Sequence, residues 1–154
     1  MATFARDPNQ YTYAYGRLPN DRPHIFRLMG SVDVPRTRVL VAANFQHFTG
    51  KPWNASTQVP LKQGNVRILI EPRGSRRLSS QSLLDLRVSR PISTRWGRFD
   101  LLLDVLNLLN DDAEEGISTD NKFAGNTLNP SFGLPTVFMD PRRAMIGIRF
   151  TTSR

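Results

Sequence analysis

The sequence predicts an all-β protein, an antiparallel up-and-down meander of about five or six strands. Three observations lead to this prediction. Apolar and polar residues alternate with a period of two in five separate segments. The 11 prolines and 10 glycines are spread along the whole chain, as many short elements joined by turns require. Short connections between the segments alternate with long ones, and 154 residues make one ordinary domain.

The first two expected strands are residues 24–34 and 38–48. The connection between them, residues 35–37, is so short that it predicts a hairpin. Residues 1–22, which precede the hairpin, are polar and rich in turn-forming residues. They are expected to form a loop or the end of a preceding strand.

A long stretch, residues 49–81, separates this hairpin from the third expected strand, residues 82–90. We expect the stretch to be irregular apart from one short alternating piece, although so long a connection is unusual in a compact domain. A second short connection, residues 91–97, follows the third strand. The last expected strand is residues 142–150, after a loop at 110–140, and residues 151–154 form a tail.

The fourth segment, residues 98–111, fits two kinds of secondary structure. As a strand it would place Phe99, Leu101 and Leu103 on one face. As a helix it would align Asp100, Asp104, Asn107 and Asp111 in one polar stripe. The clear period of two on both sides of the segment favours a strand.

The composition excludes several classes of site. The chain has no cysteine, which rules out disulfides, cysteine-based zinc sites and thiol nucleophiles. Its two histidines, His24 and His47, are expected to be polar residues near strand ends rather than metal ligands. The acids at 111–120 match no ordered calcium loop and predict a solvated loop. No apolar run is long enough for a transmembrane helix, and no secretory signal is visible.

Each expected strand has one face of apolar side chains and one face that carries charges. The apolar faces consist of Phe26, Leu28, Val32, Val34, Val39, Val41, Ala43, Phe45, Leu84, Leu86, Val88, Phe99, Leu101, Leu103, Val105, Ala144, Ile146, Ile148 and Phe150. The polar faces include Arg27, Asp33, Arg38, Asn44, Asp85, Arg87, Asp100, Asp104, Arg143 and Arg149.

Two architectures fit these faces. A soluble meander would bury its apolar face in a core, whereas a transmembrane β-barrel would turn that face to lipid and its polar face to a wet lumen. Charges in mid-strand, apolar faces clean of charge in each central span, and alternating short and long connections all favour the barrel. The pattern alone leaves both architectures open.

Four strings of residues occur in a characteristic order. Asp21-Arg22-Pro23-His24 opens the first strand, and Phe48-Thr49-Gly50-Lys51-Pro52-Trp53 closes the second. Leu103 to Asn110 contains Asp104, Asn107 and Asn110, and Gly147-Ile148-Arg149-Phe150 lies near the end. As an ordered set over roughly residues 16–150, they resemble the C-terminal part of a TonB-dependent receptor barrel. More narrowly, the chain is similar to Oar-like members that carry a carboxypeptidase-regulatory-like domain.

The resemblance implies a partial segment of a transmembrane β-barrel of about 22 strands in the cell outer membrane. Family members import scarce nutrients such as iron chelates, cobalamin or glycans. It implies a transporter and no enzyme, with no catalytic residue, metal ligand or cofactor. The apolar faces become lipid-facing, the polar faces lumen-facing, and the motif residues are Asp21, Arg22, Pro23, Gly50, Pro52, Trp53, Asn107 and Asn110.

The resemblance also implies partners and sidedness. The partners are outer-membrane lipid, the remainder of the barrel with its plug, and TonB through an N-terminal region. The plug, the TonB-contacting box and the signal peptide precede the region matched, so we expect this chain alone not to transport. The short connections and the C-terminus should be periplasmic, and the loops at 49–81 and 110–140 should lie outside.

Two other functions fit some of the sequence. A soluble basic β-sheet protein could bind nucleic acid or another anionic partner, given the net charge of +8. It would need aromatic residues interleaved with basic ones on an exposed face, which the pattern lacks, so no nucleic-acid partner is expected. A hydrolase built on Asp100 and Asp104 would need a pocket that nothing supplies. Arg73, Arg76 and Arg77 are expected at a hydrated loop edge, and Phe48 and Trp53 in an aromatic girdle.

Overall fold

The computed structural model of the protein describes residues 7–62 and 64–152. Over this part of the chain every regular element is a β-strand, apart from the single 3-10 helix η1 (Pro8–Tyr11). All strand pairs are antiparallel. The chain forms two compact units. We call them the sheet unit (residues 24–48, 80–112 and from 140 on) and the connection unit (residues up to 23, 49–79 and 113–139).

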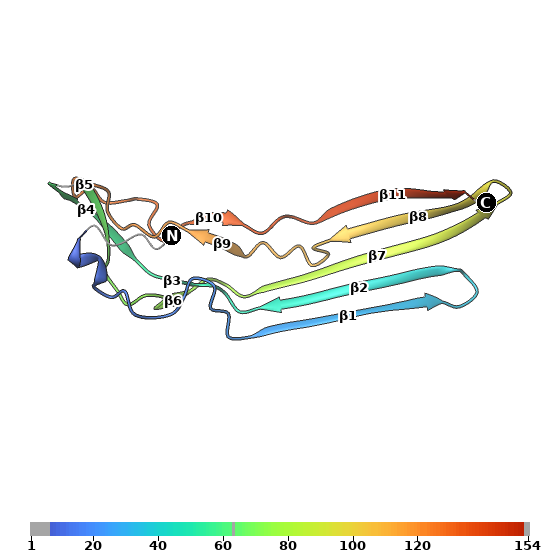
Figure 1. The fold of residues 1–154 in the computed structure, drawn as a ribbon, viewed down its shortest axis with the longest axis horizontal. Coiled ribbons are helices and arrows are strands. Elements are labelled where there is room, and N and C mark those ends of the chain that lie inside the picture. The colour runs from blue at the N-terminus through green and yellow to red at the C-terminus, as the bar shows by residue number, and fades with distance from the viewer. Residues whose placement is uncertain (1–6, 63, 153–154) are drawn as a thin grey trace. The chain divides into compact units, whose positions relative to one another are not determined.

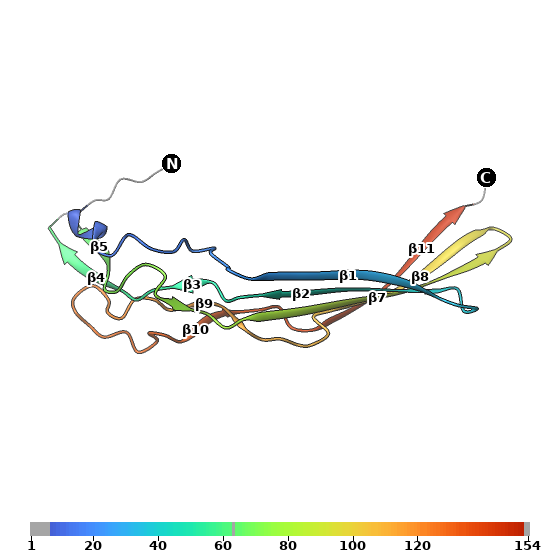
Figure 2. The same ribbon diagram turned by 90° about the horizontal axis from the view of Figure 1, so that it is seen from below.

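The sheet unit is one five-stranded meander in the order β1-β2-β7-β8-β11 (Figure 1). Its strands are β1 (Ile25–Val34), β2 (Val39–Phe48), β7 (Gln81–Thr94), β8 (Gly97–Leu106) and β11 (Arg143–Thr152). Seen from below, these strands form a single twisted layer (Figure 2). The all-β, antiparallel prediction is therefore confirmed, and the ambiguous segment 98–111 forms a strand over most of its length.

The second short connection differs from the expectation. β7 continues through Pro91 to Thr94, so the turn is only Arg95-Trp96 rather than residues 91–97. Proline is tolerated here because β2 pairs with β7 only as far as Ser89, which leaves one edge of β7 without a neighbour. At the other end of the unit, β11 includes Thr151 and Thr152, which we expected in the tail; residues 153–154 lie outside the described residues.

The connection unit contains strands where we expected irregular loops. The stretch 49–81 holds a hairpin of β4 (Ser56–Leu61) and β5 (Gly64–Leu69), and a short pair of β3 (Pro52–Trp53) and β6 (Arg76–Arg77). In the second loop, β9 (Glu114–Ile117) pairs with β10 (Pro135–Phe138). β5 overlaps the one short alternating piece expected in 49–81, whereas the other strands of this unit carry too little alternation to be recognised in the sequence.

The buried apolar residues lie in the connection unit. Within the described part of the chain they are Ala55, Val66, Leu78, Ala113 and Met139. The motif residue Gly50 also belongs to this unit, and a Cβ there would collide with the carbonyl oxygen of Leu78. Glycine at position 50 is thus required by the close approach of two backbone segments.

Candidate functional site

The strand register places all the residues of the expected apolar faces on one face of the sheet. Residues directly opposite each other in an antiparallel pair point to the same side. One row shows this across all five strands: Val32 lies opposite Val41, Val41 opposite Val88, Val88 opposite Leu103, and Leu103 opposite Ile146. We call this surface the apolar face.

The apolar face is not covered by the rest of its unit. Ile146 is 84% exposed, Ile148 68% and Leu28 61%. Within the described residues, no buried apolar side chain belongs to the sheet unit. Contiguous exposed apolar surfaces are rare on soluble monomers, and in other proteins they often belong to binding sites for proteins, membranes or ligands.

The opposite side of the sheet, the polar face, carries the charges. The register places on it Arg27, Asp33, Asn44, Asp85, Arg87, Asp100, Asp104, Arg143 and Arg149. Arg38 stands in the first turn, with a φ of 57°, and lines a groove on this face. The sheet therefore gathers all the charged side chains of its five strands except Arg90 on one surface.

Several charges of the polar face pair with one another. Arg87 lies opposite Asp104, and its Nε and Nη2 donate to the two carboxylate oxygens at 2.5 and 2.8 Å. Arg98 Nε donates to Asp100 at 2.7 Å. Asp85 accepts a hydrogen bond of 3.0 Å from the backbone N–H of Asn107. Bidentate pairing fixes the side chains while leaving them open to water.

Two open grooves run along the polar face. One, of about 540 Å³, is lined by Met29, Asn44, Asp85, Arg87, Asp104 and Met145 among others. The other, of about 440 Å³, is lined by Arg38, Arg98, Arg149, Asp33 and Asp100 among others. Among the described residues, no group of three or more histidines, aspartates or glutamates is placed to hold a metal ion.

The sheet unit also positions the two motif asparagines at the exit of β8. Asn107 and Asn110 have φ values of 50° and 54°, a left-handed conformation that asparagine tolerates. The buried Asn107 donates through Nδ2 to the carbonyl oxygens of Asp111 (2.9 Å) and Asp140 (2.8 Å). Asn110 Oδ1 accepts from the backbone N–H of Arg142 at 3.2 Å. Both residues fix how the chain leaves the sheet.

His47 occupies the apolar face near the end of β2. Its Nδ1 lies 2.9 Å from Ser82 Oγ, directly across the strand pair. His24 lies next to the start of β1. Neither histidine belongs to a cluster of potential metal ligands in the described chain.

The remaining motif residues lie in the connection unit. Arg77 joins two of them, because its Nη1 donates to the carbonyl oxygens of Asp21 (2.9 Å) and Gly50 (3.0 Å), and its Nη2 to the Asp21 carboxylate (3.0 Å). Arg77 is therefore a clamp between two distant segments and not the hydrated edge residue we expected. Arg22 and Pro23 follow Asp21 directly and lead into β1.

Trp53 also lies in the connection unit, in β3 beside Pro52, and not in one of the five long strands. The Arg76 guanidinium lies 4.9 Å from the Trp53 ring centre, and Phe132 packs edge-on against the same ring at 6.4 Å. Arg76 also pairs with Glu71 at 3.0 Å. These contacts give Trp53 a packing role inside its unit.

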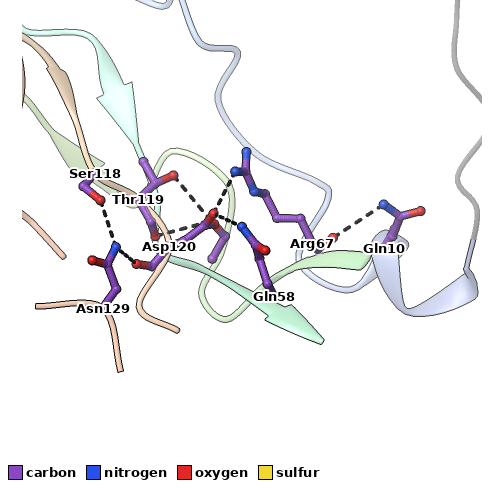
Figure 3. A network of polar contacts seen from close by, with 8 residues as sticks. Gln10, Gln58, Arg67, Ser118, Thr119, Asp120 and Asn129 are labelled. Carbon is purple, nitrogen blue, oxygen red and sulfur yellow. Dashed lines mark hydrogen bonds and ion pairs between the residues drawn. The ribbon is translucent and has the colours of Figure 1, made fainter. Parts of the chain in front are cut away.

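A polar network around Asp120 joins the connection unit internally (Figure 3). Asp120 Oδ1 accepts from Ser56 Oγ at 2.5 Å, and Oδ2 from Gln58 Nε2 at 2.9 Å and Arg67 Nη2 at 2.7 Å. Asn129 Nδ2 donates to the carbonyl oxygen of Asp120 at 2.7 Å. Asp120 is only 7% exposed, which corrects the expectation that all the acids at 111–120 are solvated.

The surroundings of Asp120 set its protonation state. Burial alone would raise the pKa of the carboxyl, but the hydrogen bonds from Ser56, Gln58 and Arg67 and the Arg67 charge outweigh it, and the pKa lies below its ordinary value. Glu71 shows the same balance. Burial raises its pKa, but the hydrogen bonds from the Ala55 N–H and from Arg76 outweigh burial, and the pKa lies below its ordinary value. A carboxylate with both oxygens occupied stabilises the fold and is not free to act as a base.

Comparison of the chain with family models, curated proteins and solved structures finds no match. Within the described residues, no helix has the length and apolar character needed to span a membrane.

Proposed function

We propose that this chain is a segment of the barrel of an outer-membrane TonB-dependent transporter for scarce nutrients. In this proposal the apolar face contacts lipid and the polar face lines the lumen. The observation that carries it is the apolar row from Val32 to Ile146, which crosses five strands with charged side chains on the opposite face. Val32, Leu103 and Ile146 are exposed, and Val41 and Val88 are half-buried. Lipid-facing and lumen-facing residues alternate in this way along barrel strands.

The dimensions of the strands support the proposal. β1, β2, β8 and β11 are each 10 residues long. A tilted transmembrane strand needs about 9–11 residues. The paired charges of the polar face also suit a wet lumen, where an ion pair stays hydrated.

The connections support it as well. The two tight turns, at 35–38 and 95–96, lie at one end of the sheet. The strand ends at Phe48, Gln81 and Leu106 lead into the long connections at the other end. Barrels of the outer membrane have short periplasmic turns and longer external loops. The substrate class (iron chelate, cobalamin or glycan), the plug and the TonB partner come from the motif resemblance.

Cysteine labelling tests membrane insertion and sidedness together. The segment has no cysteine of its own, so single cysteines at Asp112 and Thr94, both exposed, can be placed in the full-length protein. An impermeant thiol reagent on intact cells should label position 112 and spare position 94, which should react only after the outer membrane is permeabilised. The reverse pattern, or no labelling of either position before lysis, would contradict the proposal.

One observation favours a second function, a soluble protein that binds an anionic partner. The 440 Å³ groove on the polar face has three arginines among its lining residues, Arg38, Arg98 and Arg149. Under this alternative the full-length protein would remain in the soluble fraction of the cell. The labelling experiment therefore separates the two functions, because a soluble protein gives no signal at position 112 on intact cells.

A further inference from the structure

Arg90 interrupts the apolar face. In the pairing of β7 with β8, Val88 lies opposite Leu103, Arg90 opposite Leu101, and Ile92 opposite Phe99. The alternation therefore places Arg90 on the same side as these apolar residues. Among the described residues of the five strands, it is the one lysine, arginine, aspartate or glutamate on this face. An isolated charge at such a position needs a partner.

That partner is not found in the described part of the chain. The Arg90 side chain is exposed and makes no ion pair, hydrogen bond or ring contact with any described residue. On the polar face, Arg87 and Arg98 each have a carboxylate oxygen within 2.7 Å, whereas Arg149 has no ion pair with a described residue and lies on the charged face. On a lipid-facing surface, the group that neutralises Arg90 therefore comes from outside the described chain.

The position of Arg90 along β7 indicates the depth of its guanidinium. Arg90 lies four residues before Thr94, where β7 ends at the turn. At about 3.3 Å per residue this is roughly 13 Å along the strand, or about 9 Å of depth for a strand tilted by about 45°. A flexible arginine stem can extend its charged end from this depth to the headgroup region. On the lipid face an arginine is strongly unfavourable at the midplane but nearly neutral near the interface.

Aromatic residues mark the same end of the sheet. Trp96, in the turn, is 64% exposed, and the Arg95 guanidinium lies 4.3 Å from its ring centre. On the apolar face, the rings of Phe99 and Phe150 pack 4.7 Å apart. Tryptophan and tyrosine side chains are enriched in membrane proteins at the interface between the membrane and water. This observation, which is independent of the strand geometry, places the interface close to Arg90.

We propose that Arg90 binds the phosphate of a phospholipid in the leaflet at the turn end of the sheet. The guanidinium offers two parallel N–H donors to the phosphate oxygens. Val88, Ile92 and Leu101 surround Arg90 with apolar surface on which the acyl chains lie. A phospholipid combines a phosphate with acyl chains and so matches a single cation within an apolar surface. The inference rests on the proposed membrane location of this face.

Lipid retention on the purified full-length protein tests the inference. Phosphatidylglycerol is titrated into the detergent-solubilised protein, and bound lipids are counted by native mass spectrometry. Arg90→Gln should weaken the tightest lipid site by about tenfold, and Arg90→Lys by less, because lysine keeps the charge but loses the bidentate geometry. The matched control is Arg149→Gln, which removes an exposed arginine from the polar face of β11 and should leave the site unchanged.

Two further probes identify the ligand. A galactosyl diacylglycerol, which has acyl chains but no phosphate, should bind wild type no better than it binds Arg90→Gln. Millimolar inorganic phosphate should not displace the phospholipid. The inference fails if Arg90→Gln retains the phospholipid or if Arg149→Gln loses it to the same extent. It also fails if the galactolipid binds as tightly as the phospholipid, or if inorganic phosphate alone fills the site. A nitroxide is then placed at position 146 of the same protein in phospholipid bilayers. A label that reports lipid would show that only this inference has failed, whereas a label that reports water would refute the membrane proposal itself.

Discussion

The side-chain amide of Asn107 donates a hydrogen bond of 2.8 Å to the carbonyl oxygen of Asp140. This contact joins the residue after β8 to the segment that leads into β11, across more than thirty residues of sequence. A second bond from the same amide reaches Asp111 at 2.9 Å, and Asn107 Oδ1 accepts from the Asp111 N–H at 3.0 Å. One buried side chain thus fixes both ends of the long connection.

Replacing Asn107 should therefore destabilise the β8–β11 pair. Asn107→Ala removes three hydrogen bonds and places a less tolerant residue at a φ of 50°, so we expect a loss of about 2–4 kcal/mol. Asn107→Asp keeps the acceptor and the backbone tolerance, and should lose less. Asn110→Ala, at an exposed site with the same backbone conformation, should lose about 1 kcal/mol or less. Urea unfolding of the full-length protein measures all three; equal losses at 107 and 110 would contradict this role.

The connection unit should lose stability in acid. Asp120, Glu71 and Glu114 all have a pKa below the ordinary value in the folded protein; burial opposes each shift, and hydrogen bonds outweigh it. A carboxyl with a lowered folded pKa contributes stability that is fully present above the unfolded pKa of about 4 and is lost as the pH falls through the folded value. Hydrogen exchange in the β4–β5 hairpin should therefore accelerate, after correction for intrinsic rates, below about pH 4.

Asp120→Asn provides the control for this acid transition. The variant cannot ionise, so its hairpin should be less protected at neutral pH and should change less between pH 6 and pH 3 than wild type does. Asp112→Asn removes an exposed acid and should leave the pH profile as it is. Wild-type protection that stays constant down to pH 3 would show that the Asp120 network does not stabilise the unit.

Two neighbouring positions on β11 should respond in opposite ways to an introduced arginine. Ile146 belongs to the apolar face and Met145 lies opposite Asp104 on the polar face. Ile146→Arg should lower the free energy of unfolding of the vesicle-inserted protein by about 2–4 kcal/mol, as arginine does near the bilayer midplane. Met145→Arg should stay within about 1 kcal/mol, since its charge points to water beside a carboxylate. Denaturant titrations of vesicle-inserted protein measure the difference, and similar losses for both would contradict the assignment of faces.

The five long strands could be predicted from the sequence because each carries its own alternation. The pairing of Val88 with Leu103, for example, follows from two strands that are neighbours in the sequence and are joined by a tight turn. The error at residues 91–97 arose because Pro91 suggests a turn. In the structure the pairing of β2 with β7 reaches only Ser89, so β7 can continue through Pro91. Arg90 was the last residue of the expected strand 82–90, but the expected apolar face stopped at Val88, although Val88, Arg90 and Ile92 continue the period of two.

The connection unit could not be predicted because distant residues hold it together. Arg77 contacts Asp21 and Gly50, which lie 56 and 27 positions away. Asp120 stands in an acid-rich stretch, and nothing near it in the sequence shows that its partners Ser56 and Arg67 come from the β4–β5 hairpin. Composition describes such a segment as solvated, whereas long-range hydrogen bonds bury one of its acids.

The central claim is that the apolar face contacts lipid, and a nitroxide scan along β11 tests it most directly. Single spin-labelled cysteines are placed at residues 143–150 of the full-length protein in phospholipid bilayers, and collisions with oxygen and with a water-soluble nickel complex are measured. The account predicts a period of two, with oxygen accessibility highest at Ala144, Ile146, Ile148 and Phe150 and nickel accessibility highest at Arg143, Met145 and Arg149. Nickel access at positions 146 and 148, or no period of two, would contradict it.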